Sequence, residues 1–226
     1  MLTHEGIASR KEAGRLAKSG RITVNGVPVR SADTHIDPEK DTVCVNGTPV
    51  IYKQYIYIML NKPAGYVSAT EDGKLPTVLE LLPDDLQDRG LFPCGRLDKD
   101  TLGLMILTND GDSAHRRLSP KHHAEKSYAF ECKLALEHLE ELEKGATLED
   151  GYVTLPSKIE QTGEKSGIIT LTEGKYHQIK RMFASVGNKI TYLERITFAG
   201  IELDRSLERG QWRYLSAAEE ALFTRD

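Results

Sequence analysis

The chain has 226 residues, enough for one substantial hydrophobic core and a small additional module. Its 39% hydrophobic and 28% charged residues are ordinary for a globular protein, and no segment approaches the roughly 20 apolar residues of a membrane-spanning helix. The start, Met1-Leu-Thr-His-Glu5, lacks the regions of a signal peptide. Cys44, Cys94 and Cys132 are odd in number and far apart, which argues against a disulfide framework and indicates a reducing cytoplasm.

The net charge of −4 conceals two basic segments. Residues 1–30 carry six basic side chains against two acidic ones, whereas acidic residues collect at 137–150. The second basic segment, 174–195, contains Lys175, Lys180, Arg181, Lys189 and Arg195. Because phosphate binding depends on local basic surface, both segments could face nucleic acid. Charge alone leaves open whether they are instead ordinary solvated faces.

The first fifty residues read as a small module. Ser9 can cap a helix that runs to about Lys18 and ends at Gly20. Residues 22–24 and 27–29 flank an Asn-Gly turn and predict a tight hairpin. A further strand is expected at 42–45, and residues 48–54 are expected to form a linker.

The rest, from about residue 55 to 226, reads as one larger α+β domain. Strands are expected at 55–60, 104–108, 126–134, 166–172 and 190–198. Helices are expected at 77–82, 110–118, 137–144, 176–186 and 216–222. Several consecutive strands lack a helix between them, which predicts a mixed, largely antiparallel sheet.

The segment Gly95-Arg-Leu-Asp-Lys-Asp-Thr-Leu-Gly-Leu-Met-Ile-Leu-Thr-Asn-Asp-Gly111 is the most informative part of the chain. A polar loop with Asp98 precedes Gly103 and a buried strand, and Asn109-Asp110-Gly111 leads into the next helix. A carboxylate on a loop against a buried strand is rigidly supported, as a catalytic group must be. Taken alone, such an aspartate is more often a turn or cap residue.

This segment resembles the catalytic motif of pseudouridine synthases of the RsuA type. Three other segments match the family in the correct order: Leu60-Asn-Lys-Pro-Ala-Gly65, Ser119-Pro-Lys-His-His-Ala-Glu-Lys-Ser-Tyr128 and Glu173-Gly-Lys-Tyr-His-Gln-Ile-Lys-Arg-Met-Phe183. The resemblance runs from about residue 55 to the end, and residues 1–50 resemble the αL-type RNA-binding domain that often precedes this catalytic domain. That domain usually opens with a longer first helix carrying an Arg-Leu-Asp-Lys-like stretch, so we expect a module short by about one to two helical turns.

The resemblance implies roles for three catalytic residues. Asp98 matches the catalytic aspartate, and the sequence leaves open whether it attacks the sugar, attacks the base or removes a ribose proton. Lys180 matches the position of a cation that offsets the cost of burying this carboxylate, although a phosphate contact is an alternative. Tyr128 matches the tyrosine that stacks on the target base, whereas its pattern alone reads as a core residue of a strand.

The resemblance also implies binding residues. Arg96 matches a residue that fills the gap left by a flipped nucleotide, and flipping costs a few kcal/mol. Residues expected to bind the substrate are Arg96, Thr101, His177, Gln178 and Arg181. Residues of the first module expected to bind RNA are Arg10, Lys11, Arg15, Lys18 and Arg21.

The expected reaction oxidises nothing and releases no group, so neither a cofactor nor a metal is expected. His122-His123 and Asp98-x-Asp100 invite a metal interpretation, but no third ligand has a suitable spacing. The 119–128 segment looks most like family members that modify small-subunit (16S) ribosomal RNA, and the sequence leaves open whether the RNA is free or within an assembling particle. We expect a monomer without a membrane partner. Three alternatives stay open: a large-subunit rRNA enzyme, a non-catalytic ribosome-assembly factor and a metal-dependent glycosyltransferase.

Overall fold

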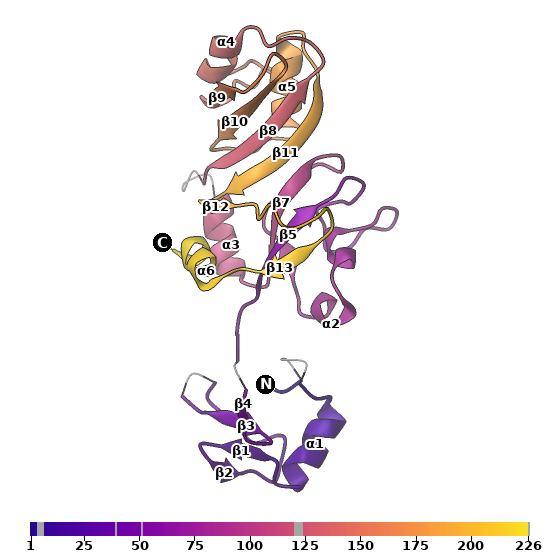
Figure 1. Cartoon of the computed structure of the whole chain (residues 1–226), viewed down its shortest axis with the longest axis vertical. Coiled ribbons are helices and arrows are strands. Elements are labelled where there is room, and N and C mark those ends of the chain that lie inside the picture. The colour runs from indigo at the N-terminus through magenta and orange to yellow at the C-terminus, as the bar shows by residue number, and fades with distance from the viewer. Residues whose placement is uncertain (4–6, 39, 51, 120–123, 226) are drawn as a thin grey trace. The chain divides into compact units, whose positions relative to one another are not determined.

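The computed structural model describes residues 1–3, 7–38, 40–50, 52–119 and 124–225. The chain divides into two compact units, Met1–Tyr55 and Ile56–Asp226 (Figure 1). Within the described residues, no helix is both long and apolar enough to cross a membrane.

The smaller unit packs one helix against a four-stranded antiparallel sheet. Helix α1 (Arg10–Lys18) begins as predicted, since the Ser9 amide donates to the Glu12 carboxylate and the Glu12 amide donates to the Ser9 hydroxyl. The sheet order is β2-β1-β3-β4, formed by β1 (Ile22–Val24), β2 (Val27–Pro28), β3 (Val43–Val45) and β4 (Thr48–Pro49). Ala13 and Ala17 of α1 are buried in one cluster with apolar residues of β1 and β3.

Two Asn-Gly turns close the hairpins of this sheet. Asn25 and Gly26 have φ values of 50° and 80°, and Asn46 and Gly47 have 52° and 80°. Positive φ at both central residues matches the turn to the right-handed twist of the strands. The predicted linker at 48–54 is therefore partly wrong, because its first two residues form β4 and pair with β3.

The larger unit is built on a nine-stranded sheet of order β13-β5-β7-β11-β8-β10-β9, with β6 and β12 paired at its side. Every pairing is antiparallel except that of β7 with β11, which confirms the predicted mixed, largely antiparallel sheet. The strands are β5 (Tyr57–Lys62), β6 (Phe92–Pro93), β7 (Leu102–Thr108), β8 (Lys126–Cys132), β9 (Lys158–Gln161), β10 (Ser166–Leu171), β11 (Ile190–Phe198), β12 (Ile201–Glu202) and β13 (Trp212–Tyr214).

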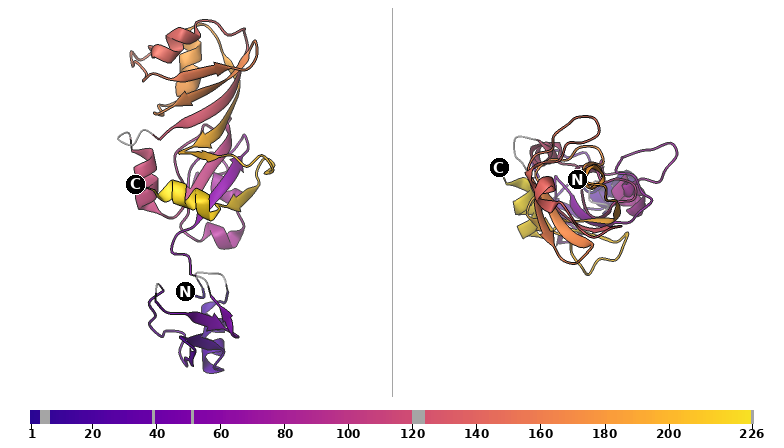
Figure 2. Two further views of the ribbon diagram at one scale, coloured as in Figure 1. Left: turned by 60° about the vertical axis from the view of Figure 1, so that its left-hand side comes forward. Right: turned by 90° about the horizontal axis from the view of Figure 1, so that it is seen from above.

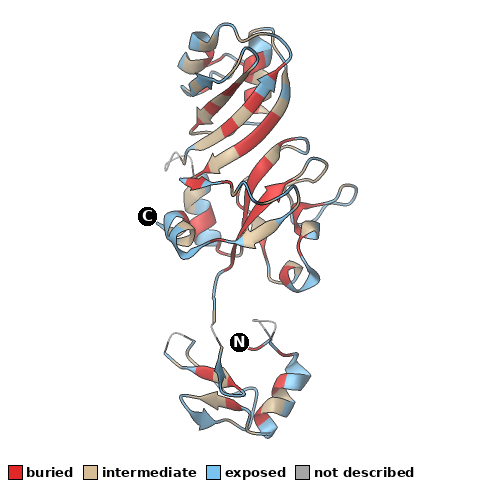
Figure 3. Cartoon of the chain, in the orientation of Figure 1, coloured by how far each residue is buried: buried red, intermediate tan, exposed pale blue. Residues whose placement is uncertain are grey.

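Both faces of the sheet are covered at its centre. Ile58 and Leu60 of β5 belong to one core and Tyr57 and Met59 to the other, so every residue of this strand is buried (Figure 3). Helices η1 (Val78–Leu81), α2 (Asp84–Gln87), α4 (Leu139–Lys144) and α5 (Gln178–Ser185) contribute to the first core. Helices α3 (Gly111–Leu118) and α6 (Ala217–Thr224) pack together and contribute to the second core (Figure 2).

The main elements lie where the sequence predicts them, apart from shifts of about two residues at several ends and the following differences. The helix expected at 77–82 is the short 3₁₀ helix η1. The helix expected at 176–186 begins only at Gln178, because His177 has a left-handed φ of 49°. In the larger unit, the short elements β6, β9, β12, β13 and α2 were not predicted from the sequence; β9, for example, is an edge strand with little apolar patterning.

The parallel contact between β7 and β11 depends on Gly103. This glycine has a φ of 95°, and a Cβ at its position would lie 2.3 Å from the Arg195 carbonyl oxygen. A residue with a side chain would therefore push the two strands apart. The contact positions the site, because β7 follows the Asp98 loop and β11 follows α5.

Candidate active site

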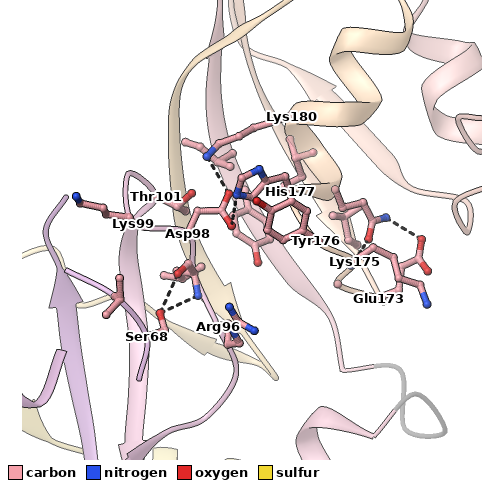
Figure 4. Close-up of a pocket in the computed structure, with 18 of the residues that line it drawn as sticks. Ser68, Arg96, Asp98, Lys99, Thr101, Glu173, Lys175, Tyr176, His177 and Lys180 are labelled. Carbon is pink, nitrogen blue, oxygen red and sulfur yellow. Dashed lines mark hydrogen bonds and ion pairs between the residues drawn. The ribbon is translucent and has the colours of Figure 1, made fainter. Parts of the chain in front are cut away.

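A cavity of about 620 Å³ lies in the larger unit, within the size range of small-molecule and nucleobase sites. Its lining comes from segments far apart in sequence: residues 67–72, the loop 96–101, Tyr128 of β8 and the segment 173–180. Figure 4 shows Tyr176, His177 and Lys180 on one side of this cavity, facing Asp98 on the loop before β7.

Asp98 is the carboxylate of the cavity that pairs with a lysine and lies beside a histidine. Lys180 Nζ donates to its Oδ2 at 2.8 Å, and His177 Nε2 lies 3.6 Å from its Oδ1. The Asp98 side chain is 25% exposed, so the charge pair is partly shielded from water while an oxygen can still be reached from the cavity. The predicted ion pair between Asp98 and Lys180 is present in the structure.

Lys180 also donates to Asp100 Oδ1, at 2.5 Å. Burial by itself lowers the pKa of the Lys180 ammonium, but hydrogen bonds to Asp100 and Asp98 outweigh this and leave the pKa above its ordinary value. Burial raises the pKa of Asp100, and Lys180 reverses this so that the carboxyl has a lowered pKa. Both partners therefore stay charged at neutral pH.

The Asp98 loop rests on Lys62, at the end of β5. This side chain is fully buried, and its ammonium lies within hydrogen-bond distance, 2.9–3.3 Å, of the carbonyls of Pro63, Asp98, Lys99 and Thr101. Burial lowers the pKa of Lys62 to about 8. Lys62 stands within Leu60-Asn-Lys-Pro-Ala-Gly65, and no role for it was predicted from the sequence. A lysine that directly follows an apolar run and an asparagine at the end of a buried strand is a signal of buried partners.

Ser68 supports the same loop from a second direction. Its hydroxyl donates to the Leu97 carbonyl at 2.9 Å and accepts from the Leu97 amide at 3.0 Å. With Lys62, it holds the backbone on both sides of Asp98. The loop is thus fixed through its backbone, so that its side chains can contact a ligand in the cavity.

Tyr128 lies on β8 between β10 and β11, and it is 9% exposed. It both lines the cavity and belongs to the first core. The two interpretations of this tyrosine in the sequence, core residue and base-contacting residue, are compatible in the structure. A buried aromatic ring beside a carboxylate provides an apolar surface for a flat ligand.

The segment 173–178 is braced by Gln178 and Glu173. Gln178 is buried; its Oε1 accepts from the Lys175 amide, and its Nε2 donates to Glu173 at 2.7 Å. Glu173 also accepts from the Tyr152 hydroxyl and the Leu155 amide. Gln178 lines the cavity but has its side-chain amide engaged within the protein, which favours a positioning role over the predicted substrate contact.

The remaining predicted substrate-binding residues differ in position. Arg96 is exposed and lines the cavity, and Thr101 lines it with a buried hydroxyl that has no hydrogen-bond partner. Arg181 is not among the cavity-lining residues. Its guanidinium instead pairs with Glu149 at 2.8 Å and Asp150 at 2.6 Å.

The basic segment 174–195 is not a continuous basic surface. Arg195 is 1% exposed, donates to the Leu104 carbonyl and stacks over Phe198. Lys180 and Arg181 are engaged with carboxylates, as described above. A count of basic residues in a segment does not predict a basic surface, because it does not show which side chains are buried. Nor does it show which ones pair with acidic residues from other parts of the chain.

The smaller unit has the expected basic surface. The residues predicted to bind RNA are all exposed: Arg10, Lys11, Arg15, Lys18 and Arg21. Lys11, Arg15 and Lys18 are spaced by four and three residues, which places them along one stripe of α1. This stripe lies apart from the apolar face that Ala13 and Ala17 bury.

His122 and His123 lie outside the described residues, as do residues 120–121 of the same 119–128 segment, which carries the small-subunit resemblance. In the part of the chain that the structure does describe, no group of three or more His, Cys, Asp or Glu side chains could hold a metal ion.

Comparison with known proteins agrees with this geometry. A family model described as RNA pseudouridylate synthase matches residues 56–185, the part that contains Lys62, Asp98, Tyr128 and Lys180. The chain belongs to this family. Its activity is the isomerisation of uridine to pseudouridine in RNA. An S4 domain model matches residues 2–43 of the smaller unit, which identifies that unit as an RNA-binding domain.

Several relatives align over nearly the whole chain. The chain is 43% identical over 225 residues to an uncharacterized RNA pseudouridine synthase, YtzG, of Bacillus subtilis (strain 168), covering 97% of this chain and 94% of that protein. It is 42% identical over 217 residues to ribosomal small subunit pseudouridine synthase A of Escherichia coli (strain K12), covering 94% and 93%. A crystal structure of a pseudouridylate synthase superposes with a TM-score of 0.71 at 34% identity, covering 98% of this chain and 96% of that one.

Proposed function

We propose that this pseudouridine synthase modifies one uridine of small-subunit (16S) ribosomal RNA, in the cytoplasm and as a monomer, with Asp98 as the catalytic residue. The observation that carries the catalytic assignment is the Asp98–Lys180 pair at 2.8 Å, beside Tyr128 in the cavity of the larger unit. The small-subunit assignment is supported by relatives named ribosomal small subunit pseudouridine synthase A, at 42% identity in E. coli and 41% in Vibrio cholerae.

The reaction needs no change in atom composition. The bond from the ribose to a base nitrogen breaks, the uracil turns, and a ring carbon bonds to the ribose instead. That carbon gives up a proton and the released nitrogen takes one. Asp98 attacks the sugar, attacks the base or takes a ribose proton, and each of these roles requires an ionised carboxylate within reach of the bound nucleotide.

Lys180 donates a hydrogen bond to the Asp98 carboxylate and holds it in place, while Tyr128 supplies the flat apolar surface for the uracil ring. The exposed Arg96 fills the gap that the flipped nucleotide leaves, and Thr101 offers its unpartnered hydroxyl to the bound nucleotide. His177 contacts the substrate beside Asp98. The exposed basic stripe of α1 binds phosphates of the surrounding rRNA.

The test is to incubate the purified protein with small-subunit rRNA and, separately, with large-subunit rRNA, and to map pseudouridine by chemical derivatisation. Asp98→Asn should abolish the new site and leave RNA binding nearly unchanged. Asp100→Asn is a matched control, because Asp100 binds the same lysine but is 74% exposed. It should retain activity.

A new site in small-subunit RNA that disappears with Asp98→Asn would support the whole proposal. A site only in large-subunit RNA would keep the chemistry and refute the substrate. An active Asp98→Asn variant would refute the catalytic assignment. If free RNA yields no site, partly assembled ribosomal subunits are the next substrate to test.

A further inference from the structure

Tyr176 is the most exposed large hydrophobic side chain of the described residues, at 73%, and it lines the active-site cavity. Burial of an aromatic ring is a main source of folding free energy, and this ring contributes little of it. Its position therefore calls for a reason other than stability. Tyr128, in contrast, is buried deeper in the same cavity.

One face of the Tyr176 ring is already stacked. The rings of Tyr176 and His177 lie 3.8 Å apart between centroids, with an angle of 18° between their planes. Because His177 covers one face and the side chain remains 73% exposed, the opposite face is open to solvent. Figure 4 shows the two rings side by side at the cavity, close to Asp98.

The backbone under this pair is held from both sides. On one side, Gln178 accepts from the Lys175 amide. On the other, Arg181 donates to the Tyr176 carbonyl at 3.3 Å while it pairs with Glu149 and Asp150. These contacts give Arg181 a structural task outside the cavity. An exposed ring on a braced segment loses little conformational freedom when a ligand stacks on it.

We infer that the Tyr176–His177 stack is a second nucleobase subsite, which receives an unpaired base next to the target uridine. This inference rests on the proposed action on RNA. Tyr128 is the surface for the flipped uracil, and its depth leaves no reason for a second aromatic surface for the same base. Tyr176 lines the same cavity as the exposed Arg96 and Lys99, whose charges attract phosphate, and this suits a neighbouring nucleotide of the same strand.

The experiment compares the full-length protein with three variants for binding to a fluorescein-labelled, unstructured RNA of mixed sequence, followed by anisotropy. Tyr176→Ala should weaken binding about fivefold to a hundredfold, the effect of removing one base–aromatic stack. Tyr176→Phe keeps the ring and should bind nearly as the native protein does. Tyr214→Ala removes another exposed tyrosine, on β13 and outside the cavity lining, and should leave binding unchanged.

Native affinity in Tyr176→Ala would overturn the inference. So would equally weak binding by Tyr176→Phe and Tyr176→Ala, because the hydroxyl rather than the ring face would then make the contact. Since this comparison needs no turnover, it judges the subsite even if the native protein makes no pseudouridine in ribosomal RNA, a result that would instead refute the proposed function.

Kinetics on the mapped rRNA site locate the stacked base. Tyr176→Ala should raise KM and leave kcat at saturating RNA nearly unchanged, since Asp98, Lys180 and Tyr128 are intact. Replacing the nucleotide on one side of the target by an abasic one should then make the native protein and Tyr176→Ala equal in KM. If no flanking abasic nucleotide removes their difference, the ring does not stack on a neighbouring base and the inference fails.

Discussion

Replacing Lys62 with methionine removes the ammonium on which the Asp98 loop rests, while a side chain of similar length stays in the core. The ammonium lies 2.9–3.3 Å from four backbone carbonyls, three of which belong to Asp98, Lys99 and Thr101. It has three N–H bonds, so it satisfies at most three of these acceptors at a time.

The size of the effect follows from two opposing terms. Three hydrogen bonds from a charged donor are worth about 6 kcal/mol at roughly 2 kcal/mol each. Burying the ammonium lowers its pKa from 10.5 to about 8, and this costs about 3 kcal/mol at neutral pH. The variant should therefore lose about 3 kcal/mol of the free energy of unfolding.

Turnover should fall as well, because the Asp98 backbone loses its support. A displacement of about 1 Å at a catalytic group costs on the order of 100-fold in rate. Urea denaturation would measure the first effect, and single-turnover pseudouridine formation the second. Lys165→Met, at an exposed site between β9 and β10, is the control for losing a lysine charge, and it should stay within about 0.5 kcal/mol of the native protein.

The pKa of Lys62 adds a pH dependence with a definite sign. Between the folded value of about 8 and the ordinary value of 10.5, the unfolded chain binds more protons at this residue than the folded chain. Lys62 therefore makes the native protein more stable as pH rises through this window, and Lys62→Met lacks that gain. If Lys62→Met matched Lys165→Met in stability and turnover, the ammonium would not be what holds the loop.

Three further predictions concern other charged groups. Lys180→Met should slow turnover of bound RNA far more than it weakens binding; the opposite result would make Lys180 a phosphate contact. The basic stripe of α1 consists of Lys11, Arg15 and Lys18, and changing all three to glutamine should weaken the salt dependence of RNA binding. The slope of log K, the RNA association constant, against log salt concentration should fall by about one per lost phosphate contact. An unchanged slope would show that the stripe does not engage RNA. Hydrogen bonds from Arg213 lower the pKa of Glu219 to about 2, so Glu219 stabilises the fold above pH 4.5 and loses this effect as pH falls toward 2. Glu219→Gln should flatten the acid-unfolding curve in that window, and native-like acid sensitivity would contradict the pairing.

Much of the fold was predictable because its signals are local. The α1 cap at Ser9, the two Asn-Gly turns and the Asp110 cap of α3 each depend on contacts within a few residues. The long strands of the sheet contain runs of apolar residues, and such runs predict strands. Short strands such as β6 and β12 lack such a run, since their pairing partners and not their own residues make them strands.

The candidate active site was likewise predictable only in part. The match of Asp98 and Lys180 to family positions predicted that they pair, with a phosphate contact of Lys180 as the alternative, although 82 residues separate them. It did not indicate that Lys62 holds the Asp98 loop, that Gln178 braces its own segment or that Arg195 is buried. Each of these depends on which face a side chain presents, and that is decided by the packing of distant strands.

The sequence by itself thus determined the family, the two-part organisation and the identity of the central charge pair. Only the tertiary structure decided which basic residues are free of acidic partners and so available to bind a ligand. Arg181 is occupied by Glu149 and Asp150, which lie some thirty residues away in the chain, and Tyr176 keeps an open ring face at the cavity. The sequence specifies which residues are charged or aromatic. Their exposure and their partners depend on the folded structure, because contacts between residues far apart in the chain determine both.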